Sequence, residues 1–210
     1  MRVFIFGDSI VQGFYDDKSG GWANQLHVQY QKKAIAHLGG ETTDVFNLGI
    51  SGDTAEGVRS RLTDEVIARR LYEDNDCIII AVGINDAILI NNRVVCEVYD
   101  FQAAYEEIID EALKLTPRVI CVGLTAVKES ETDPWPYSNQ GKQWKNNRIN
   151  LFEDTIKQSA ENKEVPFVPI HDEFLKLLGK KQLLADALHP NHAGHAFIAR
   201  EVLAAIEALR

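Results

Sequence analysis

Three side chains have the types and spacing of a nucleophile and its activating pair, one near the N-terminus and two near the C-terminus. Asp186 and His189 occur in the sequence Asp-Ala-Leu-His, three residues apart. On a helical turn this spacing makes the two side chains neighbours, so the carboxylate can accept a hydrogen bond from the imidazole Nδ1–H. The Nε2 atom is then free to act as a base toward a serine hydroxyl. Ser9, in Gly-Asp-Ser-Ile, is the candidate nucleophile and would attack an acyl carbon.

Ser9 lies just beyond the carboxyl end of a predicted strand. Residues 3–6 are β-branched and aromatic, and Gly7 and Asp8 end the run. Ligands bind at the carboxyl ends of the strands in an open α/β sheet, so a hydroxyl placed there is a candidate nucleophile. A serine in a strand-to-helix turn can also be the N-cap of the helix. We expect Ser9 to combine the two roles.

Two further turns carry groups that could stabilise an oxyanion. Gly52 follows the short predicted strand 44–48, and Asn85 follows the apolar predicted strand 77–82. The tetrahedral intermediate of acyl transfer needs hydrogen-bond donors aimed at its oxygen, and each such donor typically contributes about 3–4 kcal/mol. We expect these donors to be the backbone N–H groups of Ser9 and Gly52 and the side-chain amide of Asn85.

The elements that must position these groups alternate between strands and helices. Because parallel neighbours need helical crossovers, this alternation predicts a five-stranded parallel sheet with helices on both sides, a three-layer α/β/α sandwich. The carboxyl ends of parallel strands lie at one edge, where segments distant in sequence can converge. The predicted strands are 3–6, 44–48, 77–82, 118–124 and 166–170, and the predicted helices are about 22–38, 54–72, 99–115, 145–162, 172–178 and 193–209.

Length and composition are those of an ordinary globular protein. The chain has 210 residues, 45% of them hydrophobic and 25% charged, and we expect one domain over residues 1–210. Lys plus Arg number 22 against 31 Asp plus Glu, a net charge of −9 without a basic cluster, so nucleic acid and anionic membranes are not expected partners. The longest apolar run, 77–84, is too short to span a bilayer, and no signal segment precedes residue 3. These features predict a cytoplasmic protein with no membrane insertion.

The three cysteines do not have the spacing of a metal site or a disulfide framework. Cys77, Cys96 and Cys121 are an odd number without a Cys-x-x-Cys pair, and two of them lie in predicted strands. We expect buried free thiols. None lies in a turn at the carboxyl end of a strand, so a cysteine nucleophile is disfavoured.

Other titratable residues near these turns have a structural interpretation. His171 precedes an aspartate, but adjacent side chains face different ways, so the pair is a poor dyad. His192 and His195 flank the start of the last predicted helix, where we expect packing or capping rather than a metal ligand. Asp8 and Asp86 are expected to accept hydrogen bonds from turn N–H groups. We predict no metal and no cofactor.

A long irregular segment carries candidate substrate-binding residues. Residues 128–141 show no periodicity and predict a loop of the kind that is often functional. Trp135 and Tyr137 lie within it, and Trp144 follows it. Their aromatic rings either attach the loop to the body of the protein or form a wall of the acyl or alcohol pocket. We expect substrate choice to be set here.

Four sequence blocks, taken in order, make the chain resemble the SGNH hydrolases, also called the GDSL esterase/lipase family. The resemblance covers essentially the whole chain. Ile10 stands where the family's name has leucine, a change that keeps volume and polarity. The blocks are Gly7-Asp8-Ser9, Gly52 in Ile-Ser-Gly-Asp-Thr, Gly83-Ile-Asn85-Asp86 and Asp186-Ala-Leu-His189-Pro190.

The resemblance implies a fold and a complete set of site residues. The implied fold is a flavodoxin-like three-layer sandwich. The implied site is a triad of Ser9, His189 and Asp186, with an oxyanion hole formed by Ser9, Gly52 and Asn85 and with no metal. Two other scaffolds are excluded, since Ser9 lacks the Gly-x-Ser-x-Gly setting of an α/β-hydrolase elbow and no Gly-x-Gly-x-x-Gly follows the first predicted strand.

We therefore expect a serine ester hydrolase that acts on small to medium acyl esters through an acyl-enzyme intermediate. The same residues would serve a thioesterase or an acyltransferase, and the sequence does not separate these from a hydrolase. A catalytically silent binding module is a hypothesis from a different class, and the intact set of site residues argues against it. The expected partner is a small-molecule ester, and the net negative charge disfavours strongly anionic substrates.

Overall fold

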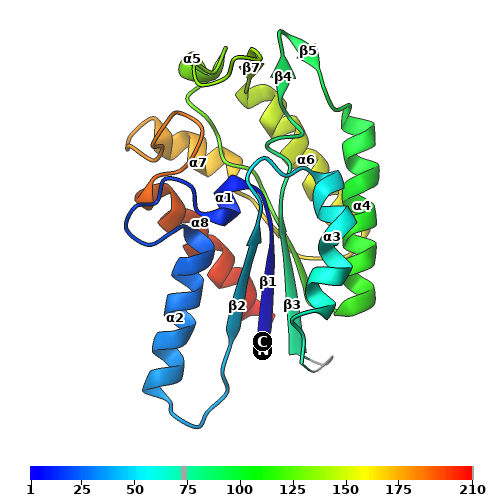
Figure 1. Ribbon diagram of the computed structural model, residues 1–210, viewed down its shortest axis with the longest axis vertical. Coiled ribbons are helices and arrows are strands. Elements are labelled where there is room, and N and C mark those ends of the chain that lie inside the picture. The colour runs from blue at the N-terminus through cyan, green and yellow to red at the C-terminus, as the bar shows by residue number, and fades with distance from the viewer. Residues whose placement is uncertain (72–74, 210) are drawn as a thin grey trace.

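A five-stranded parallel sheet lies at the centre of the computed structural model, which describes residues 1–71 and 75–209 (Figure 1). The strand order is β2-β1-β3-β6-β8, and every pairing in this sheet is parallel. This is the flavodoxin-like order, so the predicted fold class is confirmed. The strands are β1 (Arg2–Gly7), β2 (Asp44–Gly49), β3 (Asp76–Ala81), β6 (Val119–Val122) and β8 (Phe167–Val168).

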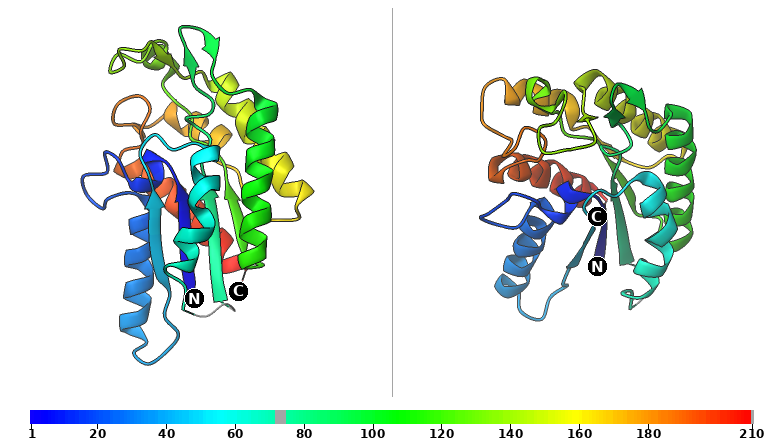
Figure 2. Two further views of the ribbon diagram at one scale, coloured as in Figure 1. Left: turned by 45° about the vertical axis from the view of Figure 1, so that its right-hand side comes forward. Right: turned by 45° about the horizontal axis from the view of Figure 1, so that its top comes forward.

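Helices cover both faces of this sheet and complete the three layers. Helices α2 and α8 pack together on one face, and α3, α4 and α6 pack on the other (Figures 1 and 2). The long helices are α2 (Trp22–Ala36), α3 (Ala55–Ile67), α4 (Val98–Leu115), α6 (Asn146–Asn162) and α8 (His192–Ala208), and the shorter ones are α1 (Ser9–Gln12), α5 (Glu129–Thr132) and α7 (His171–Leu178).

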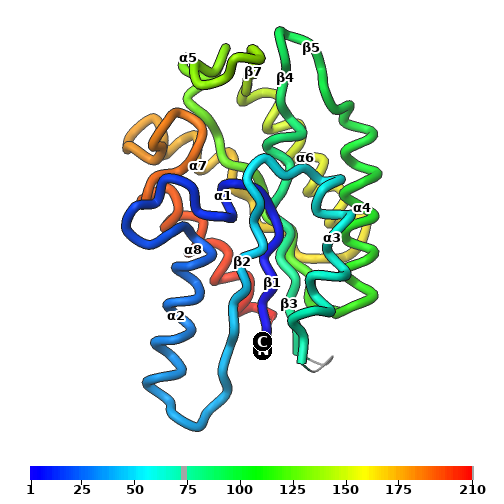
Figure 3. Tube along the Cα trace, viewed as in Figure 1, coloured from blue at the N-terminus to red at the C-terminus, as the bar shows by residue number. Residues whose placement is uncertain are grey.

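The register of the three neighbouring strands β2, β1 and β3 aligns their carboxyl ends. Gly7, the last residue of β1, is opposite Gly49 of β2 and Ala81 of β3. The three turns that follow these strands therefore begin side by side at one edge of the sheet, as the chain trace shows (Figure 3). Those turns contain the predicted residues Ser9, Gly52 and Asn85.

Side-chain caps start two helices beside this edge. Thr54 is the N-cap of α3, and its hydroxyl accepts a hydrogen bond from the backbone N–H of Gly57 at 3.3 Å. Asn191 is the N-cap of α8, and its side-chain oxygen accepts from the N–H groups of Ala193 and Gly194 at 2.9 and 3.2 Å. Such caps typically stabilise a helix by about 1 kcal/mol. They also fix the loops that lead into the site.

The structure differs from the sequence predictions in several short elements. A small antiparallel sheet, β5-β4-β7, was not expected; its strands are β4 (Leu89–Ile90), β5 (Arg93–Val94) and β7 (Lys142–Gln143). Asn91 and Asn92 join β4 to β5 with positive φ angles of 50° and 61°, as in a two-residue hairpin turn. The predicted loop 128–141 contains α5. Helix α3 ends at Ile67, and the predicted end at Tyr72 lies outside the described residues.

The three cysteines are free, as expected. Cys77 and Cys121 are buried in β3 and β6, whereas Cys96 is only partly buried and departs from the expectation. Burial raises the pKa of the Cys77 and Cys121 thiols to about 12, so neither is a thiolate nucleophile at neutral pH. None of the helices within 1–71 and 75–209 is both long and apolar enough to cross a membrane.

A buried glutamate joins α6 to the ends of two strands. The Glu153 carboxylate accepts hydrogen bonds from the backbone N–H groups of Leu124 at 2.5 Å, Ile170 at 3.2 Å and His171 at 3.1 Å. Glu153→Leu is expected to lower the free energy of unfolding by about 3 kcal/mol or more, because three buried donors lose their acceptor. Urea denaturation measures this loss. Glu161→Leu, on the exposed surface of the same helix, should change stability by less than about 0.5 kcal/mol, and equal losses in both variants would contradict the assignment.

Candidate active site

The nucleophile turn is built from the end of β1 and a single turn of helix. A Cβ at Gly7 would lie 2.2 Å from the carbonyl oxygen of Ala81, so only glycine fits there. Asp8 is the N-cap of α1, and its side chain accepts from the N–H of Ile10 at 2.8 Å, as predicted for this carboxylate. The expectation that Ser9 itself caps the helix is wrong, because Ser9 is the first helical residue. Its side chain is left free to face the site.

Asp186 and His189 meet in a tight loop. The Asp186 Oδ2 atom lies 2.8 Å from His189 Nδ1, and Asp186 Oδ1 accepts from the backbone N–H groups of Leu188 and His189 at 3.2 and 2.7 Å. Ala187 has a φ of 73°, so this segment is not the helical turn that the spacing suggested. The Asp186 carboxylate therefore stabilises this loop through the backbone N–H groups and also orients the imidazole of His189.

The structure brings the serine and the histidine into hydrogen-bond contact. The Ser9 Oγ atom lies 3.0 Å from His189 Nε2, and both residues are buried, at 6% and 7% exposure. Burial raises the pKa of Asp186, but hydrogen bonds from the side chain and backbone of His189 lower it further, to below its ordinary value. An ionised carboxylate at Nδ1 favours the tautomer in which Nε2 accepts from the serine hydroxyl. This arrangement can transfer a proton from Ser9 to His189.

Gly52 and Asn85, the two other predicted oxyanion residues, are linked through the turn that follows β2. Gly52 has a φ of 83°, is exposed, and would have open space around an added Cβ. The next residue, Asp53, accepts a hydrogen bond on its carbonyl oxygen from the Asn85 amide at 3.0 Å. An amide nitrogen has two N–H groups, so the second can be donated to a substrate oxygen. The turn that contains Gly52 therefore also orients Asn85.

Asp86 fixes the turn after β3, which contains Asn85, to the start of α3. Its carboxylate oxygens lie 3.1 and 3.2 Å from the backbone nitrogen of Ala55, so its predicted role as an acceptor is confirmed. Burial raises the pKa of Asp86 to about 6, and the hydrogen bond from Ala55 opposes that shift. Asp86 thereby holds the turn containing Asn85 against the helix that begins after Gly52.

The three predicted aromatic residues have different environments. Trp144 is 2% exposed and donates its indole N–H to the carbonyl oxygen of Ile84 at 2.9 Å, so it attaches the segment to the core. Trp135 lies beside the site, with its ring centroid 6.2 Å from that of His189. Tyr137 packs on Trp135 at 5.5 Å and is 73% exposed. Trp144 therefore fits the first alternative, attachment of the loop to the body of the protein. Trp135 has the position expected for the second alternative, a wall of the substrate pocket.

Sequence reasoning missed two aromatic residues at the site. Phe14 and Tyr15 follow α1, and their ring centroids lie 5.8 and 5.3 Å from that of His189. They occur in a Gly- and Asp-rich connection without hydrophobic periodicity, so no pattern indicated which way they face. Their proximity to Ser9 in sequence was the available signal.

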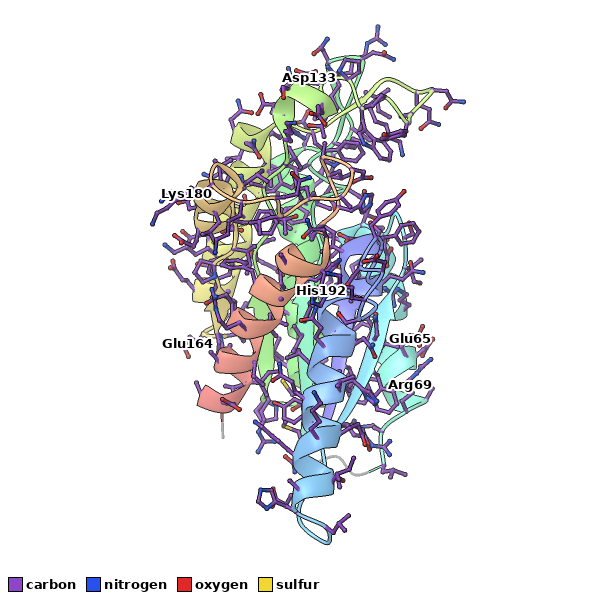
Figure 4. All side chains as sticks on the ribbon, turned by 90° about the vertical axis from the view of Figure 1, so that its left-hand side faces the viewer. Glu65, Arg69, Asp133, Glu164, Lys180 and His192 are labelled. Carbon is purple, nitrogen blue, oxygen red and sulfur yellow. The ribbon has the colours of Figure 1, made fainter. Side chains whose placement is uncertain are left out.

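Asp16 was also missed, and it organises the loop that carries these rings. Its carboxylate accepts from the backbone N–H groups of Lys18, Ser19 and Gly21, each at 3.1 Å. It also lies 3.0 Å from Nδ1 of His192, which Figure 4 labels at the start of α8. Burial raises the pKa of Asp16, but hydrogen bonds from the Ser19 hydroxyl and from these three backbone N–H groups lower it well below the usual range. The carboxylate therefore stays ionised and joins the loop to α8.

His195 and His171, the two other histidines considered in the sequence analysis, contact protein atoms. His195 is fully buried, its Nδ1 accepts from the Trp22 N–H at 3.3 Å, and its Nε2 lies 3.2 Å from the carbonyl oxygen of Phe14. His171 Nδ1 lies 3.4 Å from the exposed carboxylate of Asp172, a long contact. Within the described part of the chain, no group of three or more His, Cys, Asp or Glu side chains could hold a metal ion.

Ser9, His189 and Asp186 thus lie in hydrogen-bond contact beside the carboxyl edge of a flavodoxin-like sheet. The chain belongs to the GDSL-like lipase/acylhydrolase family, whose family model matches residues 5–197. The resemblance seen in the sequence is therefore confirmed. The protein is a carboxylic ester hydrolase.

Individual relatives agree with this family membership. An acetylxylan esterase of Geobacillus stearothermophilus is 29% identical over 169 residues, which cover 76% of this chain and 70% of that protein. A crystal structure of an acetylxylan esterase from the same organism has a TM-score of 0.72 at 23% identity, and covers 98% of this chain and 93% of the other. An α/β hydrolase enzyme from the metagenome of Lake Arreo, Spain, has a TM-score of 0.72 at 22% identity, and covers 100% and 96%. The two structures share the fold.

Proposed function

We propose that this protein is a serine esterase that hydrolyses short-chain acyl esters, acetyl esters above all, through an acyl-enzyme. The observation that carries the proposal is the chain of hydrogen bonds from Ser9 Oγ to His189 Nε2 at 3.0 Å and from His189 Nδ1 to Asp186 Oδ2 at 2.8 Å. A nucleophile, a base and an orienting carboxylate in this sequence of contacts are the parts needed for covalent acyl transfer.

The steps follow from these contacts. His189 Nε2 takes the hydroxyl proton as Ser9 Oγ bonds to the carbonyl carbon, and Asp186 stabilises the imidazolium. The backbone N–H groups of Ser9 and Gly52 and the amide of Asn85 donate to the oxyanion. The imidazolium then gives its proton to the leaving alcohol oxygen, and the acyl group stays on Ser9. A water molecule, deprotonated by the same imidazole, releases the acid and restores the hydroxyl.

One observation supports a short acyl chain. The relative that is 29% identical is an acetylxylan esterase, and solved structures of the acetylxylan esterase from the same organism include catalytic mutants in which a serine or a histidine is replaced by alanine.

The dependence of turnover on the length of the acyl chain tests the proposed preference for short acyl groups. The wild-type protein is expected to turn over p-nitrophenyl acetate at least about tenfold faster, in kcat/KM, than the octanoyl ester, because a site selective for acetyl groups gains nothing from the extra methylenes. Steady-state assays over esters from acetyl to palmitoyl measure this. A maximum at the long chains would contradict the proposed short-acyl specificity.

The pH dependence tests the base. Activity is expected to fall as the pH is lowered from roughly 8 to 5, because an imidazole base that is protonated cannot accept the Ser9 proton. The pKa of Asp186 is below its ordinary value, so that carboxylate stays ionised and adds no second loss of rate in this range. The measurement is kcat/KM for p-nitrophenyl acetate against pH. A flat profile across the range would argue against an imidazole base.

A further inference from the structure

Aromatic rings from two separate segments lie next to the imidazole of His189. Phe14 and Tyr15 follow α1 and are 38% and 55% exposed. Trp135 lies between α5 and β7, and its ring is 6.2 Å from the imidazole. In Figure 1 the segment after α1 lies beside the carboxyl ends of the strands, and the α5–β7 segment lies beyond them at the top of the molecule. The edge of the site next to the histidine is therefore aromatic.

The rings of the second segment form a series from the core to solvent. Trp144 is buried, Trp135 packs on it at 5.4 Å, and Tyr137 packs on Trp135 at 5.5 Å. The backbone N–H of Trp135 donates to the carbonyl oxygen of Lys142 in β7 at 2.8 Å. Asp133, at the top of Figure 4, forms an ion pair with Lys145 at 3.0 Å. The exposed ring of Tyr137 therefore packs on Trp135, whose segment is fixed to β7 and to Lys145.

The first segment is held in a costly conformation. Tyr15 has a φ of 62°, in the left-handed region that disfavours a large non-glycine side chain. The N–H of Phe14 donates to the carbonyl oxygen of Ser9 at 3.0 Å, and Asp16 fixes the loop that follows. Strained residues that surrounding contacts maintain are concentrated at ligand sites. Tyr15 combines that strain with an exposed ring beside the histidine.

We propose that Phe14, Tyr15, Trp135 and Tyr137 form a carbohydrate subsite, which binds the pyranose ring whose hydroxyl carries the ester. This inference rests on the proposed esterase function and assigns the alcohol half of its substrate. The leaving alcohol must lie on the side of His189, because the imidazolium protonates the leaving oxygen. That is the side on which Phe14, Tyr15 and Trp135 lie, at centroid distances of 5.3 to 6.2 Å from the imidazole, and Tyr137 packs on Trp135.

The chemistry of these rings suits a sugar better than an alkyl chain. The face of an aromatic ring is negative, and it attracts the positive C–H groups that cover one face of a pyranose. The hydroxyls of Tyr15 and Tyr137 can hydrogen-bond the sugar hydroxyls. An alkyl chain would need an enclosed apolar groove. Phe14, Tyr15 and Tyr137 are instead exposed and Trp135 is only partly buried, and the rings meet at steep angles, 82° for Phe14 with Tyr15 and 79° for Trp135 with Tyr137.

The test removes single rings and compares three acetyl esters. Tyr15→Asn keeps a residue that tolerates positive φ, and Tyr137→Ser removes the outermost ring. Tyr99→Ser is the matched control, since Tyr99 is 79% exposed on α4. The substrates are peracetylated methyl xylopyranoside, ethyl acetate and hexyl acetate. The first two variants are expected to lower kcat/KM for the xyloside relative to ethyl acetate by about 3- to 10-fold each, and the control to leave the ratio within about twofold.

Two results would overturn the subsite. One is an unchanged ratio in both site variants. The other is a loss on hexyl acetate equal to that on the xyloside, which would make the rings a surface for alkyl chains.

A binding measurement separates this inference from the esterase function. Saturation-transfer NMR of xylobiose with Ser9→Ala needs no turnover. If the wild-type protein hydrolyses none of the three esters, the esterase function fails. Binding that is weakened by adding Tyr15→Asn or Tyr137→Ser would still support the subsite, and the absence of binding at millimolar xylobiose would overturn it.

Discussion

Ser9→Ala is expected to lower kcat for p-nitrophenyl acetate by about 10⁴- to 10⁶-fold. The hydroxyl 3.0 Å from His189 Nε2 is the proposed nucleophile, and alanine leaves the base with no group to activate. Only the oxyanion donors and substrate binding would remain, which by themselves give a small part of the acceleration. Steady-state turnover of the purified variant measures the loss.

A matched serine-to-alanine variant controls for general effects of the substitution. Ser60 is exposed on α3, where its hydroxyl donates to the carbonyl oxygen of Gly57 at 2.7 Å. Ser60→Ala is expected to keep wild-type turnover within about twofold. Retention of more than about a tenth of the activity by Ser9→Ala would remove Ser9 from the mechanism.

Asp186→Asn is expected to lower kcat by about 10⁴-fold. The amide can keep the acceptor for the backbone N–H groups of Leu188 and His189, so the loop should stay closed. Its NH2 group, however, would face Nδ1 of the ring and favour the tautomer in which Nε2 carries the proton. That nitrogen could then no longer accept the proton of Ser9.

The control for this variant removes the same charge from another aspartate beside a histidine. The Asp172 side chain is 94% exposed and lies 3.4 Å from His171 Nδ1. Asp172→Asn is expected to keep kcat within about twofold. If Asp186→Asn behaved like this control, the carboxylate would be structural and would not orient the base.

The central layers of the fold could be predicted from the sequence because the long elements have strong patterns. Strand β3 is apolar from Cys77 to Ala81, as expected for a strand covered by helices on both faces. The alternation of strands with helices predicted parallel pairing, which the sheet has. The two-residue strands β4, β5 and β7 are too short to show alternation. Asn91-Asn92, which joins β4 to β5, suits a hairpin turn because asparagine tolerates positive φ, but the pair by itself did not predict the hairpin.

The candidate site likewise contains residues that the sequence could predict and residues that it could not. Ser9, Asp186 and His189 could be proposed because their types and spacing match a known chemistry, and the structure places them within hydrogen-bond distance. The closed loop between the last two was mistaken for a helical turn, since a separation of three residues fits both. The positions of Phe14 and Tyr15 depend on how an irregular loop folds over α8, which no local pattern encodes.

Covalent labelling of the serine tests the central claim most directly. The wild-type protein is incubated with a fluorophosphonate, and the modified residue is found by intact-mass and peptide mass spectrometry. The proposed mechanism predicts one adduct per chain, located on Ser9, absent from Ser9→Ala and formed far more slowly by Asp186→Asn. A wild-type protein that stays unmodified, or equal labelling of wild type and Ser9→Ala, would contradict an activated serine at this position.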